Sequence, residues 1–408
     1  MKFGFIAHAR WTSELRKIFL LRHDVSLIPF KSNKAIEKKS LEAGLIKDIF
    51  TYRKVLSAQK TRCSGRVFCV FLTPEQLLEN QERAVELVVE ACSQAKEWGA
   101  EIVGLGAMTA VIGSRGRETN AQSPVPVTTG NSLTVYSSLK AFQEMVKKLE
   151  IDIHRQKIVI VGFPGSIALA ITRALLEEGV SLVLVSRRTT PFLKRFMADL
   201  DEATRKKVEI SSDLPDALSK GKIIFSATSS GNLIDPDMLQ PGSIVFDIAQ
   251  PRDVINKKEK RKDVLIIDAG TVSLPRTTLF NYHTISLPFF SFLTLPAWTW
   301  QFREQHFLNY SGVGPYYLPS CLGETITLAM EGRPESFSLG RELTLDRVRE
   351  IGRLSEKHGF IFDQFISFDK GISQEQYGRT QKALNSSNGR GEDNKKMNIE
   401  RSTSNIEC

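Results

Sequence analysis

The chain has 408 residues, 41% of them hydrophobic and 25% charged, with a formal net charge of +9. This length and composition predict a globular protein with two or three domains. The N-terminal segment lacks the continuous apolar stretch of a secretory signal, so we expect a cytoplasmic protein. Its five cysteines show no CxxC or Cys/His spacing, which argues against a disulfide framework and against a zinc or other metal site.

The positive charge is concentrated in NKKEKRK, residues 256–262, where five of seven residues are cationic. Such a run predicts either a binding surface for an acidic partner or a solvated, lysine-rich loop. No aromatic residues alternate with these cations, so we do not expect nucleic-acid binding.

The first 135 residues combine the strand-like MKFGFIAH, a long helical stretch over residues 75–99 and the strand-to-loop segment AEIVGLGAMTAVIG. This order predicts an α/β domain. Apolar residues at helical spacing follow the turn-like TTGN at residues 128–131, and they predict a connecting helix over residues 136–155.

Residues 156–275 contain six apolar runs rich in β-branched residues, separated by helical or loop segments. This rhythm predicts an α/β domain with a doubly wound parallel sheet, the Rossmann fold. Residues 276–370 contain the helical segments CLGETITLAMEG and TLDRVREIGRLSEKHGF, and we expect them to join residues 1–135 in an α/β substrate domain. The polar tail, residues 371–408, is expected to be disordered because it cannot bury a core.

An aromatic stretch within residues 276–370, ISLPFFSFLTLPAWTW at 285–300, is interrupted by Pro288 and Pro296. It is shorter than the roughly 20 residues that a membrane-spanning helix needs, so we expect no transmembrane segment. The stretch favours a hydrophobic loop that lines a cavity, packs between domains or makes peripheral contact with a membrane surface.

A glycine-rich turn follows the first strand of the predicted Rossmann domain and leads directly into a helix. Gly162 permits the tight turn, Gly165 lets the backbone approach a pyrophosphate, and the free N–H groups at the helix N-terminus attract phosphate. Ala168 stands where the pattern usually has its last glycine, and a plain turn between strand and helix is the alternative. The predicted dinucleotide-binding loop contains Gly162, Pro164, Gly165, Ser166 and Ile167.

The second strand of this domain ends in Ser186, Arg187 and Arg188. An NAD site usually has an acidic residue here, which binds the ribose hydroxyls. Arginine instead pairs well with a 2′-phosphate, so we predict NADPH as the cofactor. The alternative is an arginine that covers the adenine or points to solvent.

Small and polar residues end the fourth and fifth strands of the domain. Ala227 and Thr228, in SATSSG at residues 226–231, lie where the ribose or nicotinamide is expected. Asp247, in FDIAQPRDV, either orients the cofactor or caps a loop.

The segments SATSSG and DIAQPRDV resemble the nucleotide domain of glutamyl-tRNA reductases and shikimate dehydrogenases. A fuller set of blocks, from about residue 3 to 360, is similar in order to aldehyde-forming long-chain acyl-(acyl-carrier-protein) reductases. These blocks are FGFIAH, GLGAMTAVI, TTGNSLTVY, IVIVGFPGSIA, CLGETITLAMEG, SFSLGRELTLDRVREIG and KHGF. The chain departs from the family at Ala168 and over residues 276–318, which are hard to match and look longer.

The resemblance implies that an acyl group passes from a phosphopantetheine thioester to an enzyme cysteine, and that NADPH then reduces the bound thioester to a fatty aldehyde. The family's nucleophile falls on Cys321, because the Glu-Gly pair at 331–332 lies at the matching distance downstream. The acyl donor would be acyl carrier protein or a coenzyme A thioester. The basic run at 256–262 would then receive the acidic carrier protein.

Independently of the resemblance, Cys321 follows Pro319 and Ser320 in the predicted first turn of a helix. A helix N-terminus stabilises a thiolate, so we expect a lowered thiol pKa. The alternative is a buried cysteine that acts as a small hydrophobic residue. Glu324 and Thr325 fall near the same helix face, and Glu324 either relays a proton or is an ordinary first-turn acid.

Three further residues are weaker candidates. His8 and Asn131 lie in family-like blocks and either hold a carbonyl or the nicotinamide, or simply end a strand and cap a turn. Cys63, in TRCSGR, faintly resembles the active-site cysteine segment of glutamyl-tRNA reductases.

Two other functions also fit parts of the sequence. One is a dehydrogenase of the shikimate or glutamyl-tRNA reductase type, which needs converging polar groups around a small polar substrate. The other is a non-catalytic NADP-binding protein whose aromatic loop contacts lipid or a partner. An acyl reductase needs instead an apolar tunnel that ends near Cys321.

Overall fold

The computed structural model describes residues 1–9, 12, 15, 32–274, 317–368 and 370–386. The aromatic stretch at 285–300 therefore lies outside the described residues. The chain forms two compact units, of which the first contains Met1–Ala141, Gly165–Arg173 and Ala269–Gln364, and the second contains Phe142–Pro164, Ala174–Asp268 and Phe365–Cys408. The N- and C-terminal segments build one α/β unit together, as predicted. No helix within the described ranges has both the length and the hydrophobicity that a membrane span requires.

The first unit is built around a five-stranded sheet with the order β2-β3-β1-β4-β5. Its strands are β1 (Lys2–His8), β2 (Ile46–Leu56), β3 (Arg62–Val70), β4 (Ile102–Leu105) and β5 (Val127–Thr128). All neighbouring strands run parallel except β2, which is antiparallel to β3. The carboxyl ends of β1, β4 and β5 therefore meet at one edge of the sheet.

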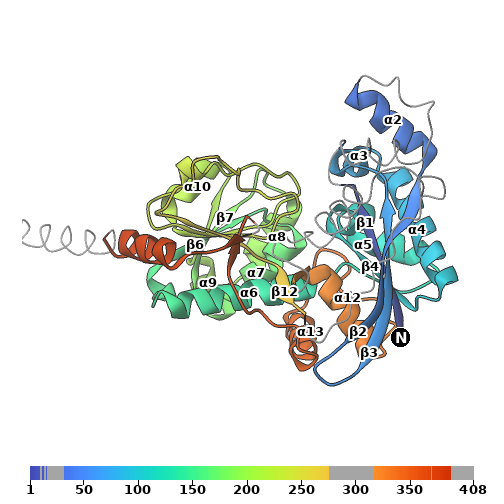
Figure 1. Ribbon diagram of the computed structural model, residues 1–408. Helices are drawn as coiled ribbons and strands as arrows, with labels where there is room; N and C mark the ends of the chain where they lie inside the picture. Colours follow the sequence, from blue (N-terminus) through green and yellow to red (C-terminus); the bar gives the residue numbers. More distant parts are fainter. Residues whose placement is uncertain (10–11, 13–14, 16–31, 275–316, 369, 387–408) are drawn as a thin grey trace, which may run out of the picture. The chain divides into compact units, whose positions relative to one another are not determined.

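Helices cover both faces of this sheet (Figure 1). On one face, α4 (Gln81–Trp98) buries seven residues in a hydrophobic cluster shared with β1, β3 and β4. On the other face, α12 (Ser320–Met330) shares a second cluster with β1, β2 and β3. The remaining elements of this unit are α2 (Asn33–Ala43), α3 (Pro74–Glu79), the short 3-10 helix η2 (Ala107–Ala110), α5 (Ile112–Gln122), β12 (Thr271–Ser273), β13 (Tyr317–Pro319) and α13 (Leu345–Lys357).

Every residue of helix α12 is buried except Cys321, which is partly buried. Leucine, isoleucine, alanine and methionine place α12 in the core, and its buried polar residues make hydrogen bonds there, as Glu324 does with Leu133 N–H. Close packing on β4 requires Gly104, because a Cβ there would overlap Thr325 Oγ1. The sheet thus fixes the position of α12 closely.

Helix α6 (Asn131–Lys148) links the two units along the chain, since its residues up to Ala141 belong to the first unit and the rest to the second. The sequence placed this connection at residues 136–155. The helix starts earlier, because the TTGN turn leads directly into it: Thr134 N–H already donates to Gly130 O at 3.2 Å.

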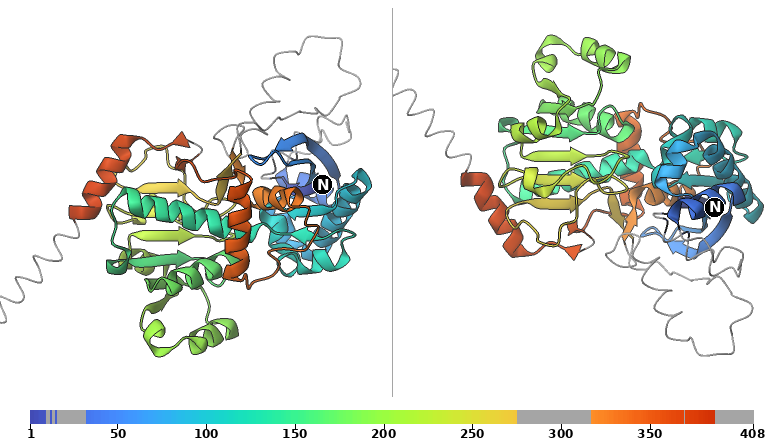
Figure 2. Two further views of the ribbon diagram at one scale, coloured as in Figure 1. Left: turned by 90° about the horizontal axis from the view of Figure 1, so that it is seen from below. Right: turned by 90° about the horizontal axis from the view of Figure 1, so that it is seen from above.

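The second unit contains a six-stranded sheet with the order β11-β10-β9-β6-β7-β8, and all its strands are parallel. This is the Rossmann order, with the topological switch point between β6 and β9; Figure 2 shows the strands side by side. The predicted doubly wound fold is therefore confirmed. The strands are β6 (Lys157–Val161), β7 (Ser181–Val185), β8 (Val208–Ser211), β9 (Ile223–Ser226), β10 (Ile244–Asp247) and β11 (Leu265–Asp268). The intervening elements are η3 (Ile153–Arg155), α7 (Ser166–Glu177), α8 (Pro191–Asp199), α9 (Glu202–Arg205), α10 (Leu214–Lys220) and η4 (Pro236–Met238), followed later by β14 (Ile366–Ser367) and β15 (Lys370–Gly371).

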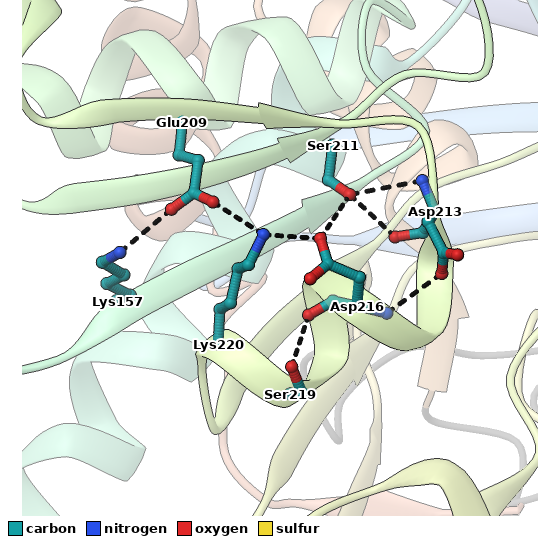
Figure 3. A network of polar contacts seen from close by, with 7 residues as sticks. All are labelled: Lys157, Glu209, Ser211, Asp213, Asp216, Ser219 and Lys220. Carbon is teal, nitrogen blue, oxygen red and sulfur yellow. Dashed lines mark hydrogen bonds and ion pairs between the residues drawn. The ribbon is translucent and has the colours of Figure 1, made fainter.

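A network of charged side chains joins β6, β8 and α10 (Figure 3). Glu209 lies 3.0 Å from Lys157 Nζ and 2.7 Å from Lys220 Nζ, and Lys220 also pairs with Asp216. Exposed pairs of this kind contribute about 0–1 kcal/mol each. Lys157 is the first residue of β6 and marks the amino end of that strand, whereas Rossmann ligands bind at the carboxyl ends. The network therefore has a structural role.

The C-terminal tail departs from its prediction. Residues 374–386 form a helix with Tyr377, Thr380 and Leu384 buried. These three residues recur at helical spacing, so a mostly polar segment still presents one buried stripe. A Cβ on Gly242 would lie 2.6 Å from Leu384 N, which shows how closely the helix packs. The expectation of disorder is wrong for residues 374–386, and residues 387–408 lie outside the described part of the chain.

Candidate functional site

Cys321 is the second residue of α12, and among the described cysteines it alone is only partly buried. The loop after β5 packs directly on it: Gly130 has a φ of +72°, and a Cβ there would overlap Cys321 Cα and lie 2.8 Å from its carbonyl carbon. The backbone N–H groups of Ala107, in η2 after β4, of Leu322 and of Cys321 itself act on the thiol and lower its pKa. Segments after β4 and β5 therefore converge on Cys321 at the start of α12.

Burial raises the pKa of the Cys321 thiol to about 11. The N–H groups of Ala107 and Leu322 lower the pKa, while the charge of Glu324 raises it further. The prediction of a lowered thiol pKa is therefore wrong. The helix N-terminus acts in the expected direction, but desolvation of the thiolate outweighs it. At neutral pH the resting group is a thiol.

The other described cysteines are buried in the core. Burial raises the thiol pKa of both Cys63, in β3, and Cys92, in α4, to about 12. Cys69 is also buried and lies at the end of β3. All three act as small hydrophobic residues, and the weak likeness of the Cys63 segment to a reductase active site finds no support.

Glu324 is completely buried, and its carboxylate holds the loop that packs on the cysteine. It accepts hydrogen bonds from Thr128 Oγ1, from Leu133 N–H at 2.9 Å and from Ser338 Oγ at 2.8 Å. Burial raises its pKa, and these donors oppose the shift. Because its oxygens are engaged by donors from the loop, Glu324 positions this loop against α12. This arrangement favours a positioning role over a proton relay.

His8 ends β1 and fixes the turn that carries Ala107. Its Nε2 accepts the N–H of Met108 at 3.2 Å, and its Nδ1 lies 2.8 Å from Ala9 O. Because Nε2 accepts this N–H group, the ring proton is assigned to Nδ1. Ala107 has a φ of +49°, which costs roughly 1–3 kcal/mol for a residue with a side chain. His8 is thus a positioning residue for the N–H group that faces the sulfur.

Asn131 and Thr325, the two remaining candidates near the cysteine, are both engaged. Asn131 Nδ2 donates to Ser166 Oγ at 3.1 Å, and both residues belong to the first unit. Thr325 Oγ1 donates to Cys321 O at 3.0 Å within the helix. Asn131 therefore contacts a residue of the predicted dinucleotide loop, and Thr325 serves the local helix structure.

The loop after β6 has the backbone geometry that a dinucleotide site requires. Gly162 has a φ of +100°, and a Cβ there would lie 2.5 Å from Ala227 O. Helix α7 begins at Ser166, and Leu169 N–H donates to Gly165 O at 2.8 Å. The N–H groups of the three preceding residues have no partner inside the helix and can bind a pyrophosphate.

Asp253, which the sequence reading missed, holds the loop after β9. It is fully buried and accepts hydrogen bonds from Ser226 Oγ at 2.6 Å and from Thr228 N–H at 3.0 Å. Thr228 Oγ1 donates to the same carboxylate. The sequence did contain a signal for Asp253, because it is the second acidic residue of DIAQPRDV. Thr228 is thus positioned by Asp253, and its hydroxyl is committed to that contact.

Asp247 organises the neighbouring loop from the end of β10. It accepts the N–H groups of Asp253 at 3.2 Å and Val254 at 2.9 Å. Burial raises the pKa of Asp247 to about 7, and the charge of Asp253 adds to this shift, whereas the N–H groups oppose it. Of the two roles left open by the sequence, the contacts favour capping of the loop.

Arg187 and Arg188 follow β7, and both are exposed. Neither forms an ion pair with another residue in the described part of the chain. Ser186 is buried and its Oγ donates to Arg188 O at 3.0 Å, which shapes the turn. The two guanidinium groups are therefore accessible to a 2′-phosphate.

The basic run at 256–262 is partly neutralised. Lys257 Nζ lies 2.6 Å from Asp235 and 2.5 Å from Asp237, and Arg261 pairs with Asp263. Two of the five cations thus support local structure. The number of cations in this run that are left for an acidic partner is therefore smaller than the sequence suggested.

Residues 144–271 match the family of shikimate/quinate 5-dehydrogenases. Over 385 residues the chain is 35% identical to "Aminotransferase PigE" of Serratia sp. (strain ATCC 39006), and the match covers 92% of this chain and 41% of that protein. It is also 28% identical over 123 residues to the glutamyl-tRNA reductase of Streptococcus sanguinis (strain SK36), covering 30% of this chain and 28% of that one. The chain thus spans about two fifths, or less, of the length of these curated relatives.

Two solved structures align with this chain at lower sequence identity than these relatives do. NAD-dependent malic enzyme from Thermotoga maritima is 14% identical, with 87% of this chain and 84% of that one covered and a TM-score of 0.34. L-tryptophan dehydrogenase from Nostoc punctiforme is 12% identical, with 63% and 64% covered and a TM-score of 0.32. TM-scores this low carry no argument about this chain. The family match over residues 144–271 and the strand order of the second sheet show that these residues form a dehydrogenase-type NAD(P)-binding domain. The predicted likeness to shikimate dehydrogenases and glutamyl-tRNA reductases is therefore confirmed.

Proposed function

We propose that the chain is an NADPH-dependent reductase that converts a long-chain acyl thioester to a fatty aldehyde through an acyl group bound to Cys321. The observation that carries this proposal is the setting of Cys321. It is a partly buried cysteine at the start of a buried helix, with backbone N–H groups that favour its thiolate, in a chain that also has an oxidoreductase-type NAD(P)-binding domain. A structural cysteine needs none of these features.

The first step is thioester exchange. The Cys321 sulfur attacks the donor carbonyl, a new carbon–sulfur bond forms, the donor's carbon–sulfur bond breaks, and the thiol proton ends on the released donor thiol. The N–H groups of Ala107 and Leu322 favour the thiolate form of Cys321, from which the attack starts. His8 and Glu324 hold the two segments that flank this sulfur.

The second step releases the aldehyde. The chemistry that NADPH supplies when bound is a hydride for the acyl carbonyl. Cys321 leaves as a thiolate, where the same N–H groups stabilise it, and it takes up a proton from water to return to the thiol. A thioester suits this step because its carbonyl is more electrophilic than that of an ester or amide.

The residues around the dinucleotide loop fit NADPH. Gly162 lets the loop approach β9, and Ser166 and Ile167 start α7 with unpaired N–H groups for the pyrophosphate. Arg187 and Arg188 offer guanidinium groups for the 2′-phosphate, which distinguishes NADPH from NADH.

The donor and the product are also part of the proposal. Thioesters of acyl carrier protein and of coenzyme A are the two acyl donors that the reaction can use. Because both donors occur in the cytoplasm, we place the reaction there. The aromatic stretch at 285–300 remains the predicted site for the acyl chain, with a possible contact to a membrane surface. An aldehyde is favoured as the product because the relative that is 35% identical is named an aminotransferase, and transamination consumes carbonyl compounds.

A second candidate is a dehydrogenase that acts on a small polar substrate. The match of residues 144–271 to shikimate/quinate 5-dehydrogenases favours it. Such an enzyme would turn over without a covalent adduct on Cys321, which separates the two candidates by experiment.

The test uses purified protein and palmitoyl thioesters of coenzyme A and acyl carrier protein. Without NADPH, intact-protein mass spectrometry is expected to show one palmitoyl adduct, absent in Cys321→Ala and present in Cys63→Ala. Adding NADPH is expected to remove the adduct and release hexadecanal. Turnover of NADPH without any adduct on Cys321 would contradict the proposal.

A further inference from the structure

A pocket with a volume of about 510 Å³ lies beside the starts of β1 and β3 in the first unit. The described residues that line it include four cations, Lys2, Arg53, Lys54 and Arg62, and a single acid, Glu101. We call it the basic pocket. Sites for small molecules typically have volumes of roughly 300–1,000 Å³. The basic pocket therefore has room for a small ligand, and its charge favours an anion.

The cations of the basic pocket come from three neighbouring strands. The turn between β2 and β3 is closed by Ser57 N–H, which donates to Thr61 O at 3.0 Å, so the end of β2 lies beside the start of β3 (Figure 1). Strand β1 pairs with β3 on its other side, where Lys2 lies opposite Ser64. Residues 2, 53, 54 and 62 are thus brought together by the pairing of the strands.

A β-bulge in β2 explains why two consecutive cations line the same pocket. Between Tyr52 and Val55 the pairing of β2 with β3 slips by one residue, and Arg53 and Lys54 together oppose Ser64. Neighbouring side chains of a regular strand point to opposite faces, whereas a bulge re-aims a side chain. Tyr52 and Val55, on either side, both belong to the hydrophobic cluster shared with α12. The bulge thus keeps the core packing and still gives both cations to the pocket.

The described contacts leave much of this positive charge available to a ligand. Lys54 is half-buried and Arg62 is exposed, and neither forms an ion pair within the described ranges. Glu101 accepts the backbone N–H of Lys2 at 3.3 Å instead of pairing with a cationic side chain. Lys2 Nζ donates to a backbone carbonyl of α4 at 3.3 Å, which leaves two of its three protons. Arg53 has an interaction of its own, so Lys2, Lys54 and Arg62 are the cations that we assign to a ligand.

The basic pocket is separate from the candidate site at Cys321. Lys2 begins β1 and His8 ends it, and the seven residues of this strand span roughly 20 Å. His8 holds the turn beside Cys321, whereas the pocket lies at the other end of the strand. A ligand in the basic pocket therefore occupies a second site of the first unit.

We propose that the basic pocket binds the phosphate groups of a small molecule that carries a diphosphate or triphosphate. A pocket lined by charges of one sign concentrates ions of the opposite sign. A phosphate monoester carries about 1.5–2 negative charges at pH 7 and has three acceptor oxygens, so a chain of phosphates can contact several cations at once. The Arg62 guanidinium binds phosphate oxygens in pairs, and the Lys2 and Lys54 ammonium groups act as point charges. This site is independent of the reaction proposed at Cys321.

The test is calorimetric titration of the full chain with sodium tripolyphosphate, ATP and adenosine, in the presence of NADP⁺ to occupy the dinucleotide loop. Tripolyphosphate and ATP are expected to bind, and adenosine is not. The double variant Lys54→Met, Arg62→Met is expected to bind tripolyphosphate about 10–100-fold more weakly, the factor lost with hydrogen bonds to a charged group. Lys47→Met, Arg83→Met removes the same two residue types from exposed positions outside the pocket, and it is expected to keep the wild-type affinity.

A higher affinity for ATP than for tripolyphosphate would assign the site to a nucleotide, and equal affinities would assign it to the phosphate chain alone; either result supports the proposal. No binding of tripolyphosphate to the wild type, or equal affinities in the two double variants, would overturn it. Binding of a polyglutamate peptide without binding of tripolyphosphate would also overturn it and indicate an acidic protein segment as the occupant.

A single variant keeps the test decisive if Lys54→Met, Arg62→Met does not fold. Because Arg62 is exposed, Arg62→Met alone is expected to fold and to weaken tripolyphosphate binding about tenfold. An unchanged affinity would count against the site. None of these titrations uses an acyl donor, so failure of the phosphate site leaves the reaction proposed at Cys321 unaffected, and the absence of acylation leaves the phosphate site unaffected.

Discussion

Gly130 is the position at which a single methyl group would most directly disturb the proposed site. In Gly130→Ala the new Cβ would overlap Cys321 Cα and lie 2.8 Å from its carbonyl carbon, at a φ of +72°. The left-handed φ costs about 1–2 kcal/mol, and forcing a methyl group into a packed contact adds about 1–3 kcal/mol. We therefore expect the free energy of unfolding to fall by about 2–5 kcal/mol.

Gly332→Ala is the matched control, because it separates the two contributions. Gly332 follows α12 with a φ of +65°, and a Cβ there would meet nothing within 4 Å. This variant is expected to lose only the conformational part, about 1–2 kcal/mol. The difference between the variants measures the contact with the cysteine.

Urea unfolding gives the stabilities, and intact-protein mass spectrometry gives the rate of Cys321 acylation. A displacement of the sulfur by about 1 Å moves it off the Ala107 N–H group and is expected to slow acylation about 10²-fold in Gly130→Ala. Gly332→Ala is expected to react at the wild-type rate. Equal stability losses in the two variants, or normal acylation in Gly130→Ala, would refute the packing that we describe.

Replacing Arg187 and Arg188 with alanine is expected to weaken NADPH binding at least about tenfold and leave NADH binding nearly unchanged; equal losses in titrations would remove the 2′-phosphate assignment. His8→Gln keeps an acceptor for Met108 N–H and is expected to retain most acylation, whereas His8→Phe loses it; similar rates in both would exclude the positioning role. Because the thiol pKa is about 11, Cys321 acylation is expected to rise nearly tenfold per pH unit from pH 7 to 9, and a flat profile would contradict this. The folded pKa of Asp247, about 7, exceeds its ordinary value of 3.8, so its contribution to stability is greatest below pH 4 and falls by about 1.4 kcal/mol per unit as pH rises to 7. Urea unfolding should show that Asp247→Asn removes this slope, and parallel curves would count against the shift.

The nucleotide-binding domain could be predicted because its signals are local. Each strand of the second sheet is one apolar run, and the glycine turn lies between a strand and a helix that are adjacent in sequence. Strand order follows from this alternation and from the handedness of parallel connections. The arginines after β7 were found for the same reason, since their place depends only on the strand before them.

Other features could not be predicted because they depend on contacts between distant segments. The raised thiol pKa of Cys321 comes from burial, which no local pattern reports. The helix at 374–386 was missed because its few apolar residues are diluted by polar ones, and only the surface that they pack on reveals them.

The contact between Glu324 and Thr128 joins residues 196 positions apart. Neither α12 nor the loop after β5 can adopt its final arrangement around the sulfur before the other has been synthesised. The strands of the nucleotide-binding sheet are therefore synthesised before the surroundings of this thiol can form. Those surroundings are complete only when the last third of the polypeptide folds back onto the first.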